Sequence, residues 1–328
     1  MDYRTLGLTG VRVSQLCCGT MSFGGDADEA AAHEMYRACR EAGINFFDTA
    51  NQYNAGRSEE LLGRLIKGHR EELVLATKCF NPTGKDVNAR GGSRRHITRA
   101  IEESLMRLGT DRVEVFYLHQ YDALTPFEES LRALEDLVRA GKILYPAISN
   151  YAAWQIQKCL GVQEAHRWAR VQVVQPMYNL VKRQAEVEIL PMAQANGIAV
   201  VPYGPAGGGL LSGKYEQKHK PATGRLAQNT QYRIRYSEEW MHETAADFAA
   251  FCRARNVHPV SMAVAWVGSH PGVTAPIIGA RNVDQLRASL DSVNVAMTPE
   301  LRAEIAALSR TPPPATDRLE EIKPKPKE

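Results

Sequence analysis

Four ionisable side chains follow the ends of three apolar segments that succeed one another in the sequence. In chain order, Asp48 and Tyr53 follow 44–47, Lys78 follows 73–77, and His119 follows 113–118. If the segments are parallel strands, their carboxyl ends open on one face, where α/β enzymes place their catalytic groups. The spacing therefore predicts that an acid, a phenol, an ammonium and an imidazole meet at one site.

Together these side chains suit proton transfer to or from an oxygen atom. A phenol has an ordinary pKa of about 10, and an ammonium at Lys78 would lower the pKa of Tyr53 by favouring the phenolate. Asp48 would hold Lys78 in its charged form, and His119 would donate a hydrogen bond to a substrate oxygen. The set predicts protonation of a carbonyl or deprotonation of an alcohol near neutral pH, and it lacks a nucleophile–base pair for acyl transfer.

Each of the four side chains also has a structural explanation of its own. Asp48 could cap the following loop, Tyr53 could pack at a rim, Lys78 could be a solvated strand end, and His119 could be a satisfied buried imidazole. Four such coincidences on successive strand ends are a weaker explanation than one shared site.

Alternating apolar and helical segments predict the elements that position these side chains. Strands are expected over 15–19, 44–48, 73–77, 113–118, 143–148, 171–175, 198–202 and 275–278. Helices are expected over 28–42, 58–67, 96–108, 126–140, 151–167, 184–195, 237–255 and 282–293. Eight strand–helix units predict an α/β fold, the (β/α)8 TIM barrel, since a doubly wound sheet commonly has about five or six strands.

The remaining segments complete the expected architecture. Residues 3–6 and 11–13 predict an N-terminal β-hairpin, and 298–309 predict an extra C-terminal helix. Residues 204–236 are expected to form a long loop over the active face. We expect one barrel domain over 1–328, in which 315–328 form a flexible tail.

Composition argues against several classes of protein. The 328 residues are 44% hydrophobic and 23% charged, as in ordinary globular proteins. A net charge of +3 does not favour nucleic acid, and no apolar run approaches membrane-spanning length. The amino terminus lacks a signal core, so we expect a cytoplasmic protein.

The six cysteines have no metal-ligand spacing, and no metal is expected. Cys79 follows Lys78, whose ammonium could lower the pKa of the thiol.

Four separated motifs resemble the aldo-keto reductase family. They are GINFFDTANQY at 43–53, GRSEELLG at 56–63, LATK at 75–78 and YLH at 117–119. The resemblance runs from about residue 3 to about residue 308, and it is to the bacterial, short-loop type near the aryl-alcohol dehydrogenases and potassium-channel beta subunits. It implies a (β/α)8 barrel that reduces carbonyls with a nicotinamide cofactor. Tyr53 would be the proton donor, Lys78 and Asp48 would tune it, and His119 would orient the carbonyl.

No Rossmann or nucleotide-hydrolase motif competes with this cofactor. No G-x-G-x-x-G follows the first strand, and the phosphate-loop-like 208–214 is followed by Tyr215 where a hydrolase needs Ser or Thr. The resemblance instead implies cofactor contacts from Thr20, Met21, Asp48, Ser149, Asn150, Gln175, Tyr203, Gly204, Pro205, Ala206, Gly208, Leu210, Lys214, Ile278, Gly279, Ala280, Arg281, Gln285 and Ser289.

Several of these contacts have an implied role. Ser149, Asn150 and Gln175 would bind the carboxamide, Tyr203 would stack on the nicotinamide ring, and 204–215 would form the pyrophosphate loop. Arg281 suits a 2′-phosphate, so NADP(H) is favoured. NAD(H) stays open as an alternative because positions 285 and 289 depart from the family pattern.

The expected partner is a small carbonyl or alcohol substrate, with no nucleic acid and no membrane. Met21, Phe23, Phe80, Gln120 and Tyr121 are expected to rim its pocket. The sequence leaves the physiological substrate, the preferred direction and the oligomeric state open. An alternative function is an NADP(H)-binding barrel that senses redox state or regulates a partner with little turnover, because a reductase-like subunit of potassium channels shares this fold and tetrad.

Overall fold

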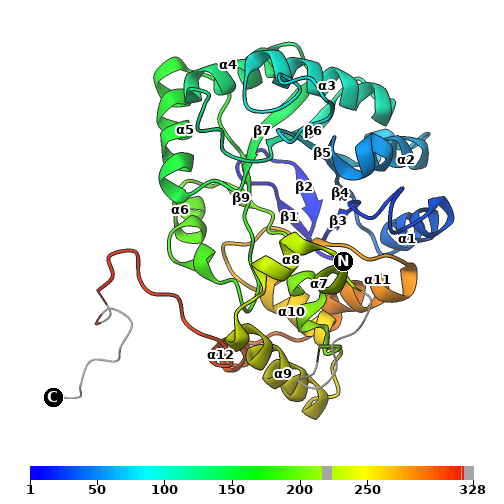
Figure 1. Cartoon of the computed structure of the whole chain (residues 1–328), viewed down its shortest axis with the longest axis vertical. Coiled ribbons are helices and arrows are strands. Elements are labelled where there is room, and N and C mark those ends of the chain that lie inside the picture. The colour runs from blue at the N-terminus through cyan, green and yellow to red at the C-terminus, as the bar shows by residue number, and fades with distance from the viewer. Residues whose placement is uncertain (216–223, 319, 321–328) are drawn as a thin grey trace.

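Eight parallel strands form the centre of the molecule in Figure 1. The computed structural model describes residues 1–215, 224–318 and 320. The sheet has the order β10-β3-β4-β5-β6-β7-β8-β9, and all neighbouring strands are parallel. The strands are β3 (Cys17–Gly19), β4 (Phe46–Asp48), β5 (Val74–Cys79), β6 (Val113–Leu118), β7 (Ile143–Ser149), β8 (Val173–Gln175), β9 (Ala199–Val200) and β10 (Ile277–Ile278).

The two edge strands of this sheet meet and close it into a barrel. Tyr203, just after β9, pairs with Ile277 of β10. The Ile277 amide donates to the Pro202 carbonyl oxygen at 2.9 Å, and the Thr274 amide donates to the Val200 carbonyl oxygen at 2.8 Å. The predicted (β/α)8 barrel is therefore confirmed, although several strands are shorter than expected.

Helices surround the strands in Figure 1. Several begin with a polar capping side chain. The Asp28 side chain accepts from the Ala31 amide at the start of α1, and Thr298 caps α12. The helices are α1 (Glu29–Glu41), α2 (Arg57–Leu65), α3 (Arg94–Leu108), α4 (Phe127–Arg139), α5 (Ala153–His166), α6 (Ile189–Ala195), α7 (Arg225–Gln228), α8 (Thr230–Arg235), α9 (Glu239–Ala254), α10 (Pro259–Gly268), α11 (Val283–Leu290) and α12 (Pro299–Ala307).

Two parts of this arrangement differ from the prediction. Helix α10 was not expected, because its apolar residues lie on all sides rather than in one stripe. The segment 204–236 is not simply a loop, since it contains the 3-10 helix η4 (Gly207–Ser212), α7 and α8. Residues 216–223 of that segment, and most of the expected tail at 315–328, lie outside the described residues. In the described part of the chain, no helix is long and apolar enough to cross a bilayer.

The predicted N-terminal hairpin is present and covers the amino-terminal end of the barrel. Its strands are β1 (Tyr3–Thr5) and β2 (Arg12–Ser14). Leu6 is fully buried and packs with Val115 and Val173 in the barrel interior. Gly7 has a φ of +57°, and a Cβ there would lie 2.9 Å from the Gly197 carbonyl oxygen, so this turn requires glycine. The opposite end of the barrel is left for the functional side chains.

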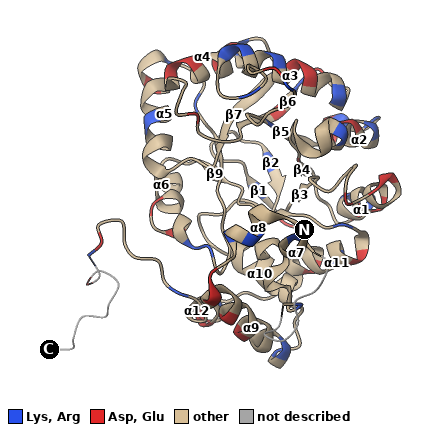
Figure 2. Cartoon of the chain, viewed as in Figure 1, with Lys and Arg blue, Asp and Glu red and all other residues tan. Residues whose placement is uncertain are grey.

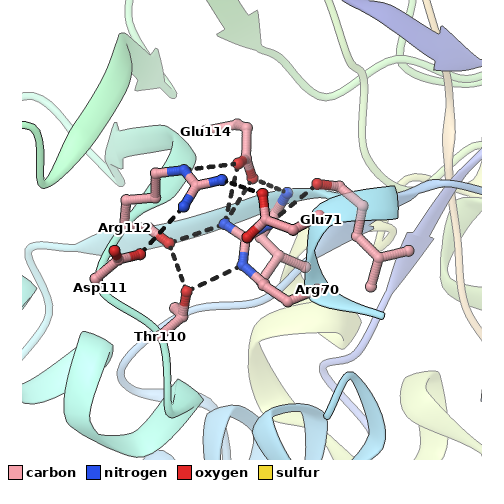
Figure 3. A network of polar contacts seen from close by, with 8 residues as sticks. Arg70, Glu71, Thr110, Asp111, Arg112 and Glu114 are labelled. Atoms are coloured by element: carbon pink, nitrogen blue, oxygen red, sulfur yellow. Dashed lines mark hydrogen bonds and ion pairs between the residues drawn. The ribbon is translucent and has the colours of Figure 1, made fainter. Parts of the chain in front are cut away.

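A buried carboxylate links β5 to β6 by hydrogen bonds near the amino-terminal end of the barrel. Glu114 on β6 has a side chain that is 9% exposed. Its two oxygens lie 3.0 Å from Nη2 of Arg70, in the 3-10 helix η2 (Arg70–Glu72), and one also accepts from the Leu75 amide at 2.7 Å. Figure 3 shows Arg70 and Arg112 on either side of this carboxylate. The network holds the two strands that carry Lys78 and His119 in register.

We expect Glu114→Gln to lower the free energy of unfolding by about 2 kcal/mol, because charge-assisted hydrogen bonds in a buried place are lost. Urea denaturation measures this. The control is Glu41→Gln, whose carboxylate is 70% exposed and pairs with Arg37 at 3.6 Å; its effect should stay below about 0.5 kcal/mol. A loss for Glu114→Gln as small as that of the control would contradict the role of the network.

Candidate active site

Parallel register brings the predicted strand-end side chains together. Asp48 ends β4 beside Ala76 of β5, and Lys78 of β5 pairs with Tyr117 of β6. His119 follows β6, and its amide donates to the Cys79 carbonyl oxygen at 2.9 Å. All three side chains therefore project from the carboxyl ends of adjacent strands.

Tyr53 is presented by a tight turn after β4, the 3-10 helix η1 (Tyr53–Gly56). Asn54, in the left-handed region with a φ of +50°, holds this turn in place. Its Nδ2 donates to the carbonyl oxygens of Met21 at 3.0 Å and Phe23 at 2.8 Å. The loop after β3 thus fixes the position of the phenol.

A hydrogen-bonded chain joins three of the four side chains. Lys78 Nζ donates to Asp48 Oδ1, to the Thr49 carbonyl oxygen at 2.7 Å, and to Tyr53 Oη at 3.5 Å. Gln175 Nε2, from the end of β8, donates to Asp48 Oδ2 at 2.9 Å. The Lys78 side chain is fully buried, so its charge depends on these oxygens.

The pKa values in this chain follow from burial and the Lys78–Asp48 pair. Burial lowers the pKa of Lys78, but Asp48 and Tyr53 together raise it more, so Lys78 remains an ammonium. Burial raises the pKa of Tyr53, and Lys78 only partly offsets that rise. The prediction that Lys78 brings the pKa of Tyr53 below its ordinary value is therefore wrong for this structure. Tyr53 is a protonated phenol at neutral pH.

His119 completes the tetrad as a neutral imidazole. Its ring meets the Tyr53 ring edge-on, with centroids 6.0 Å apart. Burial, followed by repulsion from Lys78, lowers the pKa of His119 to about 3. Its Nδ1 is buried and has no hydrogen-bond partner among the described residues. A neutral imidazole can donate one N–H bond to an oxygen without adding charge to the site.

The predicted amide set adjoins the tetrad at the ends of β7 and β8. Ser149 Oγ donates to the Gln175 carbonyl oxygen at 2.9 Å. Asn150 Nδ2 donates to Ser149 Oγ at 3.1 Å and to the His119 carbonyl oxygen at 2.9 Å. Asn150 Oδ1 accepts from Tyr203 Oη at 2.7 Å. The three polar side chains and the Tyr203 ring therefore lie in one connected group.

The Gly-rich segment after β9 forms a bend that suits close approach of an anion. Gly207, Gly208 and Gly209 all have positive φ. Lys214 lies beside Gly209, with Nζ 3.2 Å from where a Cβ there would be. Burial and then repulsion from Arg281 and Arg225 lower the pKa of Lys214. A glycine bend beside three cations fits the diphosphate of a dinucleotide.

Arg281, after β10, is held by two contacts across this region. Its Nε lies 3.0 Å from Asp26 Oδ2, in the loop between β3 and α1. Its Nη2 donates to Gln228 Oε1 of α7 at 3.1 Å. The predicted neighbour Gln285 accepts from the Arg281 amide at 3.3 Å. A phosphate bound by Arg281 would compete with Asp26 for the guanidinium.

Other predicted cofactor contacts fall into buried and accessible groups. The side chains of Leu210, Ile278 and Ser289 are buried, so these positions offer an open site little beyond their backbone. Thr20 is also buried, and its hydroxyl lies 2.8 Å from Ser58 Oγ. Pro205 and Ala280 are buried as well, Met21, Gly204 and Ala206 are half-buried, and Gly279 is exposed.

The predicted substrate rim is only partly correct. Phe23 is 1% exposed and packs in the core between strands and helices, because the turn after Thr20 folds it inward. Met21 and Phe80 are half-buried, and Gln120 is exposed. Tyr121 packs against Phe127, at 5.4 Å between ring centroids.

Cys79 is fully buried, and burial raises the pKa of its thiol, so the suggested activation by Lys78 is wrong.

Several residues at this face were missed from the sequence. Arg225, Tyr232 and Arg235 lie in the segment expected to be a loop, and Asp26 precedes the cap of α1. Residues 225–236 are rich in aromatic and basic side chains, and this composition could have indicated a binding role. It has no helical or strand periodicity, so the sequence did not predict where these side chains lie.

Comparison with known proteins agrees with this geometry. A model of the Aldo/keto reductase family matches residues 15–310. An uncharacterized oxidoreductase of Bacillus subtilis, YrpG, is 38% identical over 92% of this chain and 94% of its own length. A probable voltage-gated potassium channel subunit beta of Oryza sativa is 34% identical over 97% and 99% of the two chains. Norsolorinic acid reductase of Emericella nidulans is 34% identical over 91% and 79%. The chain belongs to the aldo/keto reductase family, and it is an oxidoreductase.

Proposed function

We propose that this oxidoreductase reversibly reduces aldehydes and ketones to alcohols with NADPH. The observation that carries the proposal is the chain from Asp48 through Lys78 to the protonated Tyr53, which ends beside a neutral His119. These groups supply a proton to an oxygen without requiring a nucleophile. NADPH, when bound, supplies the hydride that reduces the carbonyl carbon.

In this proposal each residue of the tetrad has a separate task. Tyr53 donates its phenolic proton to the carbonyl oxygen as that oxygen gains negative charge. Lys78 stabilises the phenolate that remains, and Asp48 keeps Lys78 charged. His119 donates a hydrogen bond that orients the carbonyl. In the alcohol-oxidising direction the same phenolate accepts the proton.

The proposed cofactor contacts rest on the family pattern and on the polar groups present. Ser149, Asn150 and Gln175 would hold the carboxamide, and the Tyr203 ring would flank the nicotinamide. The glycine bend at 207–209 and Lys214 would hold the diphosphate. The bend requires glycine, because a Cβ at Gly208 would come within 2.6 Å of the Tyr232 ring. Arg281 would hold the 2′-phosphate.

We expect Arg281→Ala to raise the Kd of NADPH about tenfold while the Kd of NADH changes less than twofold, since only NADPH carries the phosphate. Quenching of protein fluorescence measures both constants. Arg287→Ala, at an exposed position of α11, is the matched control. Equal weakening of both cofactors by Arg281→Ala, or a wild type that binds NADH as tightly as NADPH, would contradict this assignment.

The alternative is an NADP(H)-binding barrel that regulates a partner. It is favoured by the resemblance to the rice protein that is named a probable channel subunit. A panel of aldehydes, followed by NADPH absorbance, separates the two functions. Turnover on any aldehyde supports the reductase, whereas tight NADPH binding with no turnover on the whole panel supports the alternative.

We also propose that the chain works as one barrel domain in the cytoplasm. All six cysteines are buried free thiols, as is usual in a reducing compartment.

A further inference from the structure

Two basic side chains near the Tyr203 end of the site have no counter-ion among the described residues. The guanidinium carbon of Arg235, on α8, lies 5.0 Å from the ring centroid of Tyr232 and 5.8 Å from that of Tyr203. Lys182, between β8 and α6, has its Nζ 5.7 Å from the ring centroid of Tyr236. Within residues 1–215, 224–318 and 320, neither basic side chain has a side-chain hydrogen bond or an ion pair.

These two cations lie against neighbouring rings, because the centroids of Tyr232 and Tyr236 are 6.5 Å apart. Burial, and next repulsion from Arg235, lower the pKa of Lys182, while Glu238 opposes the shift without forming an ion pair with either cation. Two like charges held together in a half-buried place destabilise the empty site. A bound anion between them would remove that repulsion, and the aromatic rings would keep both cations in position.

Arg235 is connected to the reacting groups through Tyr203. Tyr203, under Arg235, donates to Asn150, and Asn150 donates to the backbone of His119. The guanidinium of Arg235 therefore stands over a ring that is joined to the tetrad by two hydrogen bonds. Figure 2 shows basic positions, in blue, close to the label of α8 near the centre of the view. An anion held here would be attached to a molecule that reaches the tetrad.

The proposed cofactor has other cations for its own phosphates. Lys214, Arg225 and Arg281 form a separate group around the glycine bend, in which Lys214 feels Arg281 and Arg225. Arg235 and Lys182 are additional to that group. Their charge is therefore available to the second ligand of the site, the carbonyl compound.

We propose that Arg235 and Lys182 form an anion subsite, which selects carbonyl substrates that carry a carboxylate or phosphate group. This inference rests on the proposed reductase function and specifies its substrate class. Arg235 offers a planar set of donors for such a group, and Lys182 adds a second charge. The other source of the same chemistry is a phosphate of the cofactor, and the experiment distinguishes the two.

The test compares 4-carboxybenzaldehyde with benzaldehyde at saturating NADPH, for wild type and Arg235→Gln. We expect the wild type to have the lower KM for the carboxylated aldehyde. Arg235→Gln should raise that KM about tenfold and change the KM of benzaldehyde less than twofold, and Arg235→Lys should restore part of the preference. The control is Arg233→Gln on the same helix, because Arg233 donates to nearby groups, Thr230 Oγ1 at 2.9 Å and the Ala227 carbonyl oxygen.

A second measurement needs no turnover. Calorimetry of benzoate binding to the NADPH complex should show a Kd about tenfold weaker for Arg235→Gln than for wild type or Arg233→Gln. If Arg235→Gln instead raises the Kd of NADPH and the KM of both aldehydes alike, the anion is a cofactor phosphate and the substrate subsite is refuted. If the wild type reduces neither aldehyde but benzoate binding depends on Arg235, the reductase proposal fails and the subsite stands. Unchanged benzoate binding and unchanged KM values would overturn the subsite alone.

Discussion

Tyr53→Phe should lower kcat for aldehyde reduction by about 100- to 10,000-fold, the range expected when a general acid is removed. The substitution deletes one oxygen and keeps the ring that meets His119 edge-on. The Tyr53 hydroxyl accepts from Lys78 Nζ at 3.5 Å, so little native structure depends on it. The Kd of NADPH should therefore stay within about twofold of wild type. Turnover that survives Tyr53→Phe would remove this phenol from the mechanism.

The pH dependence of wild-type reduction gives a second readout of the same assignment. Reduction needs the protonated phenol, so kcat/KM falls as pH rises through the pKa of Tyr53. Burial raises that pKa above the ordinary value of 10.0, and the fall should begin only beyond pH 10. His119, with a pKa of about 3, should produce no inflection near the ordinary imidazole value of 6.5. An inflection near 6.5 that disappears in His119→Asn would show that the imidazole is the acid.

Lys78→Met should have the largest effect on stability, lowering the free energy of unfolding by about 3–5 kcal/mol, because it leaves Asp48 as an unpaired buried charge. Activity should fall as well, since the phenolate of Tyr53 loses its stabilising charge. The raised pKa of Lys78 fixes the pH window: the stabilisation is complete below the ordinary value of 10.5 and is lost as pH rises through the folded-state value. Urea denaturation at pH 7 and pH 11 measures both effects.

A double variant separates charge from packing in this experiment. Asp48→Asn combined with Lys78→Met removes both buried charges and should recover most of the stability that Lys78→Met loses. Its activity should stay as low as that of Lys78→Met. If Lys78→Met alone were as stable as wild type, Lys78 and Asp48 would be uncharged in the folded protein, and this result would contradict the proposed role of Lys78.

The strand ends could be predicted from the sequence because their signals are local and regular. Apolar runs such as 113–118 alternate with helical segments, and a parallel barrel then places every carboxyl end on one face. Asp48, Lys78 and His119 meet for this reason alone, before any contact is known. The same spacing placed Tyr53 with them, and the family motifs gave Tyr53 its role as proton donor and extended the prediction to the amide set at the ends of β7 and β8.

The rest could not be predicted because it depends on tertiary burial. Helix α10 is apolar on all sides, a pattern that carries no amphipathic period. Phe23 faces inward only because the turn after β3 folds back on Thr20. The pKa of Tyr53 reflects a balance between burial and Lys78 that no spacing reveals. Arg235 and Lys182 are far apart in sequence, and only the folded segment 225–235 brings them near each other.

Isotope transfer tests the central claim, that this site moves a hydride to a carbonyl carbon while Tyr53 supplies the proton. The wild type is incubated with an aldehyde and NADPH carrying deuterium at both C4 positions, and the alcohol is analysed by mass spectrometry and NMR. We predict one deuterium on the carbinol carbon in every molecule of product, with product formation reduced by Tyr53→Phe. Alcohol without deuterium, or labelled alcohol formed equally fast by Tyr53→Phe, would contradict the claim.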